Sequence, residues 1–380
     1  MSLSFAPAPR SALGRHRQLA PTASIKVSPL CLGAMNFGEA GEAFMGKCDK
    51  TTTFEILDFF KANGGNFIDT ACNYQEEESE TRIGEWMEAR GCRDEMVVAT
   101  KYTSNYMLKH GFDNVIQSNY CGNGAKTMKL AVEASLKKLK TDYLDLYYVH
   151  WWEFTTSVEE LMLCLNDLVR SGKVLYLGIS DTPAWIVAKC NQYARDHGLR
   201  QFSVYQGKWN ASSRDMEREI VPMCVAEGMG ITPFRALGGG SFKTEEQRKS
   251  TEGRKAFGPA SEAEIKMIEC LGTIANPKGV GLTSVALAWI MQKAPYVFPI
   301  VGGRKIDHLR GNIEALSLEL SDEEIKKIDE ASEFDAGFPL TFLSFNKEAV
   351  KGPNDIFMVK MSNSSMDFHE AVKPIKPHRA

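Results

Sequence analysis

The sequence predicts an α/β protein of the (β/α)8 TIM-barrel class, built as a single domain over residues 1–380 with long loops at the carboxyl ends of its strands. Eight short runs rich in β-branched and aromatic residues alternate with helical patterns between residue 27 and about residue 330. Most of these runs are apolar on both faces, as expected for parallel strands covered by helices. The long irregular stretches all follow strands, and in a barrel such loops gather at one end.

The predicted strands are 27–32, 66–70, 97–102, 144–150, 174–180, 202–206, 230–234 and 297–301. Helix signals lie between them. A Ser three residues before a Glu, the pattern of a capping box, occurs at Ser157, Ser261 and Ser321. Thr182 before Pro183 predicts a further helix start, and glycines at 64–65, 91 and 172 fall where helices should end. A doubly wound Rossmann sheet is the alternative fold, but no GxGxxG follows any strand.

Long loops are expected at 33–49, 103–125 and 235–260, each after a predicted strand. Residues 1–25 are interpreted as an N-terminal extension of the barrel. Residues 333–380 form a C-terminal tail rich in Phe, Asn, Ser and Pro, which is expected either to fold over the loop-bearing face or to be partly disordered. Loops at the carboxyl ends of barrel strands carry active sites, so the function should lie there.

Composition excludes several classes of function. The chain is 43% hydrophobic and 24% charged with a net charge of −3, and no long basic run indicates nucleic-acid binding. No apolar stretch is long enough for a transmembrane helix, and the first 25 residues lack the apolar core of a secretory signal. The nine cysteines include no CxxC pair, which predicts reduced thiols in a cytoplasmic protein rather than disulfides or a zinc site. No nucleic-acid or membrane partner is therefore expected.

Polar residues stand at the carboxyl ends of several predicted strands. They are Asp69, Lys101, His150 at the end of "LDLYYVH", Ser180 with Asp181, and Gln206, while Tyr74 follows Asp69 by five residues. Each of them alone has an ordinary structural explanation, such as a helix cap, a solvated strand end or a loop aromatic. In a barrel, however, these positions converge on one pocket, and together they favour an active site.

The chemistry of this set indicates proton transfer without a metal. A free tyrosine has a pKa of about 10, which an ammonium nearby lowers by favouring the phenolate. A carboxylate beside the lysine keeps the lysine charged despite burial. Asp69, Lys101 and Tyr74 would therefore form a tuned general acid with a lowered tyrosine pKa, and a neutral His150 could orient a substrate oxygen. No HxH or HExxH spacing offers a metal site.

Several segments resemble the aldo-keto reductase superfamily. They are "LCLGAMNFG" (30–38), "GGNFIDTACNYQ" (64–75), "VVATKY", "LDLYYVHWW", "VLYLGISD" and "PIVGGRKIDHLRGNIEAL". The resemblance covers roughly residues 13 to 335 and includes, in order, the Asp/Tyr/Lys/His tetrad of that superfamily. Within it, "GRHRQLAP", "IGEWMEARG", "GKVLYLGISDTPAW" and "FPIVGGRK" are similar to the fungal aryl-alcohol dehydrogenase and norsolorinic acid reductase branch.

The resemblance implies that a hydride passes from NADPH to a carbonyl carbon and that Tyr74 protonates the oxygen. Lys101 and Asp69 would lower the pKa of Tyr74, and His150 would orient the carbonyl. The cofactor would be held at the nicotinamide by Ser180, Asp181, Gln206 and Phe234, along the pyrophosphate by the 235–241 loop with Arg235, Leu237 and Gly239, and at the adenosine phosphate by Gly302, Gly303, Arg304, His308 and Asn312.

Three positions depart from the usual pattern of the superfamily. Asp181 stands where Asn is usual, and an ionised Asp cannot donate to the carboxamide oxygen of nicotinamide. Phe234 replaces a Tyr or Trp and has no polar tip. Gly303 and His308 stand where many relatives have Ser or Lys and then Arg or Gln, although Arg304 and Lys305 keep positive charge nearby. We therefore expect NADPH/NADP+ in preference to NADH.

Aromatic residues near the predicted strand ends indicate an aromatic carbonyl substrate. The candidates are Phe37, Tyr102, Trp151, Trp152, Phe154 and Trp209, of which Phe37, Trp151 and Trp152 are predicted to contact substrate. The substrate would be a benzaldehyde or a larger polyketide-type aryl ketone, and the sequence favours neither of the two. Two other hypotheses are a cofactor-sensing regulatory barrel subunit, which could carry the same tetrad, and a metal-dependent barrel hydrolase.

Overall fold

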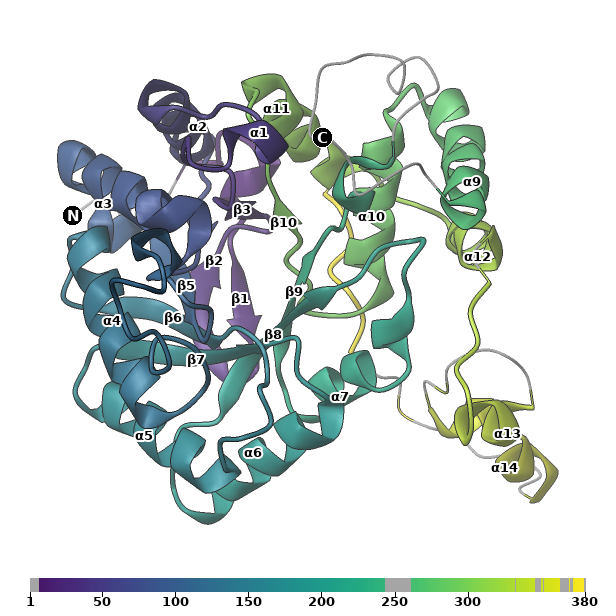
Figure 1. Cartoon of the computed structure of the whole chain (residues 1–380). Coiled ribbons are helices and arrows are strands. Elements are labelled where there is room, and N and C mark those ends of the chain that lie inside the picture. The colour runs from purple at the N-terminus through teal and green to yellow at the C-terminus, as the bar shows by residue number, and fades with distance from the viewer. Residues whose placement is uncertain are drawn as a thin grey trace, which may run out of the picture.

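Eight parallel strands form the centre of the molecule and helices surround them (Figure 1). The computed structural model describes residues 7–242, 261–331, 333–345, 350, 352–362, 369 and 372–378. The barrel strands are β3 (Cys31–Gly33), β4 (Phe67–Asp69), β5 (Val97–Tyr102), β6 (Leu144–Val149), β7 (Val174–Ser180), β8 (Phe202–Lys208), β9 (Gly230–Phe234) and β10 (Ile300–Val301). Their order is β10-β3-β4-β5-β6-β7-β8-β9. The predicted (β/α)8 class is confirmed.

The two ends of the sheet meet and close the barrel. The backbone nitrogen of Ile231 in β9 donates to the carbonyl of Tyr296 at 2.9 Å, and the nitrogen of Phe298 donates to the carbonyl of Ile231 at 2.8 Å. The last predicted strand, 297–301, is therefore only partly correct. Pro299 interrupts its ladder because a proline has no N–H to donate, so regular pairing is limited to Ile300–Val301.

An antiparallel hairpin of β1 (Arg17–Ala20) and β2 (Ala23–Val27) precedes the barrel. Leu19 and Val27 of the hairpin pack in one buried cluster with Phe67 and Val97, which begin β4 and β5. The hairpin therefore covers the amino ends of the strands and leaves the carboxyl ends open to ligand. The predicted strand 27–32 is thus wrong, since it joined the end of β2 to the start of β3.

The helices around the strands follow the predicted signals closely. They are α1 (Glu42–Met45), α2 (Lys50–Ala62), α3 (Glu78–Arg90), α4 (Ala125–Leu139), α5 (Val158–Arg170), α6 (Ala184–Asp196), α7 (Ile220–Ala226), α9 (Glu262–Lys278), α10 (Leu282–Lys293), α11 (Ile306–Glu314) and α12 (Asp322–Ala331). The three serines predicted as caps accept hydrogen bonds from the backbone nitrogen of the glutamate three residues later. Helix α6 starts one residue later than predicted, because Thr182 donates its hydroxyl back to Ser180.

The tail after α12 carries two short helices, α13 (Leu340–Ser344) and α14 (Phe357–Ser362), which project away from the barrel in Figure 1. Its last described residues include Lys376, which pairs with Glu319. Much of the predicted 235–260 loop, namely 243–260, lies outside the described residues. Across the ranges that are described, no helix combines the length and apolar character needed to cross a membrane.

Candidate active site

The ends of β4 and β5 place a carboxylate beside an ammonium. Nζ of Lys101 donates to Oδ1 of Asp69 at 2.6 Å and to the carbonyl of Thr70 at 2.7 Å, and it lies 3.4 Å from the hydroxyl of Tyr74. Lys101 is 0% exposed and Asp69 is 4% exposed. A charge buried this deeply needs a partner in hydrogen-bond contact, so the pair is a unit. Three of the predicted catalytic residues are thus in direct contact.

The electrostatics of this unit keep the lysine charged and the tyrosine protonated. Burial lowers the pKa of Lys101, but Asp69 and Tyr74 more than offset it, so the pKa is raised. Burial raises the pKa of Tyr74, and the opposing effect of Lys101 is smaller. The sequence predicted a lowered pKa for Tyr74. That prediction is wrong for this structure, because desolvation of the phenolate outweighs its attraction to the ammonium.

His150 follows β6 and completes the predicted tetrad. Its ring meets that of Tyr74 edge to face, with centroids 5.9 Å apart. Burial, helped by the charge of Lys101, lowers the pKa of His150 to about 3. The imidazole is therefore neutral near neutral pH, where it can offer one N–H donor and one nitrogen acceptor.

Tyr74 begins a turn with unusual backbone geometry. The next three residues, Gln75, Glu76 and Glu77, have φ of 51°, 50° and 80°, a region that non-glycine residues seldom adopt. Gln75 secures the turn from one side, accepting from the nitrogen of Gly41 at 2.6 Å and donating to the carbonyl of Met35 at 3.0 Å. Glu77 secures it from the other side by pairing with Lys109 and Lys138.

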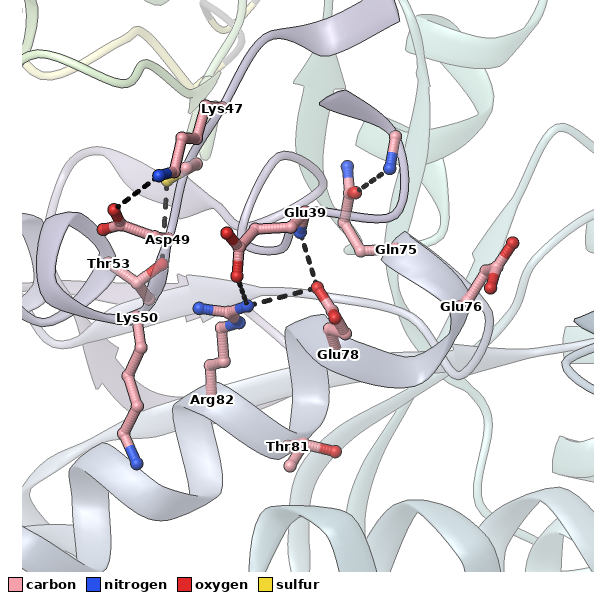
Figure 2. Close-up of polar contacts among 12 residues, drawn as sticks. Glu39, Lys47, Asp49, Lys50, Thr53, Gln75, Glu76, Glu78, Thr81 and Arg82 are labelled. Atoms are coloured by element: carbon pink, nitrogen blue, oxygen red, sulfur yellow. Dashed lines mark hydrogen bonds and ion pairs between the residues drawn. The ribbon is translucent and has the colours of Figure 1, made fainter. Parts of the chain in front are cut away.

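A second set of contacts joins the loop after β3 to helix α3, as Figure 2 shows. One nitrogen of Arg82 lies 3.0 Å from Glu39 and 3.2 Å from Glu78. Glu78 also accepts from the backbone nitrogen of Glu39 at 2.5 Å. The side chain of Glu76 points away from these contacts (Figure 2). The loop after β3 is therefore tied to the segment that positions Tyr74.

The residues predicted to hold nicotinamide lie at the ends of β7, β8 and β9. The hydroxyl of Ser180 is buried next to the carboxyl of Asp181, which it helps to stabilise in its charged form. Gln206 donates to Oδ2 of Asp69 at 2.9 Å. Asp181 lies at the rim, where desolvation by the surrounding protein raises its pKa to about 6 against the influence of Lys101. Phe234 ends β9 and is half-buried.

The predicted pyrophosphate loop has a backbone that suits an anion. Arg235, Gly238, Gly239 and Gly240 have φ of 53°, 70°, 64° and 101°. Glycines with positive φ allow the backbone of this loop to approach a ligand closely, which suits a phosphate group. Leu237, between them, packs against the main core.

The predicted adenosine-phosphate segment leads from β10 into the N-terminus of α11. Gly302, Gly303, Lys305 and Asn312 line one small recess there. Arg304 lies against Gly46 so closely that a Cβ on that glycine would be 1.9 Å from the guanidinium. His308 is exposed in the first turn of α11. Cationic side chains at a helix N-terminus suit a phosphate group.

The loop after β3 also reaches this segment, because the amide of Asn36 donates to the carbonyl of Gly303 at 3.1 Å. Together with Gln75, this contact makes the loop a bridge between the phosphate segment and the Tyr74 turn. Across the described ranges, no group of three or more His, Cys, Asp or Glu side chains is arranged to hold a metal.

The aromatic residues predicted to contact substrate divide into two groups. Phe37 is 0% exposed, Trp152 is 8% exposed, and Tyr102 and Trp209 are fully buried, so these four serve the core. The structure therefore argues against Phe37 and Trp152 as substrate contacts. Trp151 is half-buried beside His150, and Phe154 is 69% exposed. These two remain available to a substrate at the rim.

Sequence reasoning missed the polar residues directly after β5. Thr103, with φ of 91°, accepts from the backbone nitrogen of His150 at 3.2 Å. Ser104 contacts both His150 and Trp151. Asn123 donates to the carbonyl of Trp151 at 2.9 Å. For Thr103 and Ser104 the signal was their position just beyond Lys101, at the end of the barrel where active sites lie, whereas Asn123 lies later in the same loop.

Comparison with known proteins agrees with this geometry. Residues 29–333 match the model of the Aldo/keto reductase family. The chain is 57% identical over 372 residues to norsolorinic acid reductase B of Dothistroma septosporum, covering 95% of this chain and 94% of the other. It is 50% identical over 371 residues to an aryl-alcohol dehydrogenase of Pestalotiopsis microspora, covering 98% and 95%.

An aryl-alcohol dehydrogenase [NADP(+)] of Phanerodontia chrysosporium is 50% identical over 346 residues, covering 88% of this chain and 90% of the other. Relatives named norsolorinic acid reductase and relatives named aryl-alcohol dehydrogenase thus both align along most of the chain. With the family model matching most of its length, the chain is an oxidoreductase and belongs to the Aldo/keto reductase family.

Proposed function

We propose that this enzyme is an NADPH-dependent reductase of aromatic aldehydes or aryl ketones, acting in reverse as an aryl-alcohol dehydrogenase, with Tyr74 as its general acid. The observation that carries the proposal is the contact of Lys101 with both Asp69 and the hydroxyl of Tyr74. An ammonium held at that point stabilises the phenolate left when the tyrosine gives up its proton.

The residues present fit a nicotinamide cofactor. The buried hydroxyl of Ser180 suits the carboxamide, and the glycines at 238–240 suit a pyrophosphate. Arg304 and Lys305 at the start of α11 suit the additional phosphate that distinguishes NADPH from NADH. When bound, the cofactor supplies the hydride for the carbonyl carbon. Family membership supports a nicotinamide cofactor, and Arg304 and Lys305 are our reason for proposing NADPH rather than NADH.

His150 and Tyr74 of the tetrad would orient the carbonyl group and protonate its oxygen. His150, neutral because its pKa is lowered, donates a hydrogen bond to the carbonyl oxygen and holds it beside Tyr74. Tyr74 then gives its proton to that oxygen as negative charge develops there. The raised pKa of Tyr74 keeps the phenol protonated at neutral pH, which favours the reductive direction.

Trp151 and Phe154 support an aromatic substrate, because they offer apolar surface beside His150. Relatives named norsolorinic acid reductase and aryl-alcohol dehydrogenase are compatible with either a polyketide-type aryl ketone or a simple benzaldehyde. The nine free cysteines support a reducing compartment such as the cytoplasm.

The decisive experiment measures NADPH oxidation with a panel of aromatic and aliphatic carbonyls. Tyr74→Phe should retain cofactor affinity but lose turnover by at least about 100-fold, the usual scale of general-acid catalysis. Tyr193→Phe, which removes a hydroxyl from the stacked Tyr193–His197 pair at the C-terminal end of α6, is the matched control and should keep wild-type rates. Binding of NADPH without turnover of any carbonyl would favour a cofactor-sensing regulatory subunit, and tighter binding of NADH would contradict the cofactor assignment.

A further inference from the structure

Ser104 occupies a place where its hydroxyl meets two rings of the candidate site. It lies just beyond β5, after Thr103, whose φ of 91° turns the chain toward the end of β6. Its Oγ is 3.0 Å from Nε1 of Trp151 and 3.3 Å from Nδ1 of His150. One hydroxyl therefore contacts both the proposed substrate-orienting imidazole and its neighbouring indole.

Chemistry fixes the direction of the hydrogen bond to Trp151, and the hydrogen bond to His150 is assigned from it. An indole nitrogen can only donate, so Oγ of Ser104 accepts from Trp151. A hydroxyl can accept twice but donate once, and its single proton is assigned here to Nδ1 of His150, which lies 3.3 Å away. A neutral imidazole with Nδ1 accepting must carry its proton on Nε2. The lowered pKa of His150 is consistent with the neutral ring that this requires.

Further hydrogen bonds fix the positions of Ser104, His150 and Trp151 relative to one another. The backbone nitrogen of His150 donates to Oγ1 of Thr103 at 3.2 Å, and the amide of Asn123 donates to the same oxygen at 3.0 Å. Asn123 also binds the carbonyl of Trp151. Because the backbone after β6 is fixed to the segment after β5, the Ser104 hydroxyl faces the imidazole in a defined geometry.

From this arrangement we infer that Ser104 is a positioning residue that selects the Nε2–H form of His150 and so directs an N–H donor at the substrate carbonyl. The inference rests on the proposed role of His150 in carbonyl reduction. No hydrogen bond to Nε2 is present within the described ranges, so that proton is available to substrate. A hydroxyl that donates to Nδ1 leaves Nε2 as the nitrogen that carries the proton, and hydrogen-bonded partners commonly set the histidine tautomer in this way.

The tautomer can be read directly from the nitrogen resonances of the full-length protein labelled with ¹⁵N-histidine. The chain has 7 histidines, and the His150 signals are those that disappear in His150→Gln. The wild type should show a protonated Nε2 and an unprotonated, hydrogen-bonded Nδ1. In Ser104→Ala the Nδ1 resonance should shift because its donor is lost. A protonated Nδ1 in the wild type, or unchanged His150 resonances in Ser104→Ala, would overturn the inference.

Kinetics of the same variants provide the second readout. Ser104→Ala should lower kcat for a benzaldehyde about five- to tenfold, the scale of its hydrogen bond to His150, with unchanged cofactor affinity. Ser104→Thr keeps a hydroxyl and should restore most of that loss. Ser135→Ala removes a buried hydroxyl that has no hydrogen-bond partner among the described residues, and it should match the wild type. An inactive wild type with the expected tautomer would refute the proposed function but not the selection of that tautomer by Ser104.

Discussion

Gln206 on β8 donates a hydrogen bond of 2.9 Å to Asp69 on β4, a strand four places away around the barrel. The other carboxylate oxygen of Asp69 accepts from Lys101. Asp69 therefore has both oxygens engaged, by an ammonium on one side and an amide on the other. This arrangement keeps the fully buried lysine charged. The stability of the barrel therefore depends on Asp69 and Lys101, which are also proposed catalytic residues.

Replacement of Lys101 by Met should therefore reduce both activity and stability. The ammonium that stabilises the Tyr74 phenolate would be lost, and Asp69 would be left as a buried charge without its cation. Breaking a buried pair on one side costs about 3–5 kcal/mol, and denaturant unfolding would measure it. The double variant with Asp69→Asn should recover much of the stability but no activity. Full activity in Lys101→Met would remove the lysine from the mechanism.

Asp181→Asn should stabilise the protein at neutral pH. Asp181 has a folded pKa of about 6, above the ordinary aspartate value of about 3.9, so the unfolded chain ionises it first. Stability is therefore lost as the pH rises between about 4 and 6, and the penalty is complete above that window. The asparagine variant should have the higher Tm at neutral pH and an equal Tm near pH 4. A lower Tm at neutral pH would contradict the direction of the shift.

The pH dependence of carbonyl reduction should then be simple in the Asp181→Asn variant. His150 titrates at about 3, so no inflection is expected near the ordinary histidine pKa of about 6.5. Tyr74 must be protonated to act as an acid, and its pKa is raised, so the rate should fall only above about pH 10. Alcohol oxidation needs the phenolate and should rise with pH toward the same limit. An inflection near 6.5 would mean that His150 carries charge during turnover.

The fold and the tetrad were predictable because their signals are local. Strand runs, helix caps and polar strand ends are visible in short windows, and a barrel brings Asp69, Lys101 and His150 to one end whatever the details of packing. The prediction of 27–32 as one strand failed because a hairpin in a different sheet runs directly into the barrel.

Properties that depend on packing were not predictable. Phe37 is an aromatic residue in a loop after a barrel strand, yet its side chain turns into the core. The direction of the Tyr74 pKa shift depends on how far burial outweighs a neighbouring charge, and spacing contains no information about that balance. Ser104 acquires its role only because Thr103 adopts a positive φ that no pattern of residue types indicates.

Trp151 and Phe37 offer a matched test of the substrate hypothesis. Trp151→Ala should raise KM for aromatic aldehydes about tenfold or more and change little for small aliphatic ones, since the half-buried indole lies at the rim. Phe37→Leu removes part of a fully buried ring and should lower Tm while leaving the aromatic preference unchanged. Steady-state kinetics on both substrate classes distinguish the two roles. If Phe37→Leu lost the preference for aromatic aldehydes, Phe37 would have to contact the substrate.

Gln75 should control how well Tyr74 is placed. Gln75→Asn keeps a residue that tolerates positive φ but is too short to reach both Gly41 and Met35, so two hydrogen bonds of about 1 kcal/mol each would be lost. The loop after β3 would keep its contacts through Glu78 and Arg82 but lose those made by Gln75, and kcat should fall about five- to tenfold.

Glu76→Asn is the matched control for this change, because Glu76 has the same left-handed backbone in the same turn while its side chain is exposed and points away from the loop (Figure 2). It should retain wild-type kcat and Tm. Since the loop after β3 also contacts the carbonyl of Gly303 through Asn36, Gln75→Asn should weaken NADPH binding as well, measurable by titration. Equal effects of the two variants would show that the turn, and not the bridge made by Gln75, positions the tyrosine.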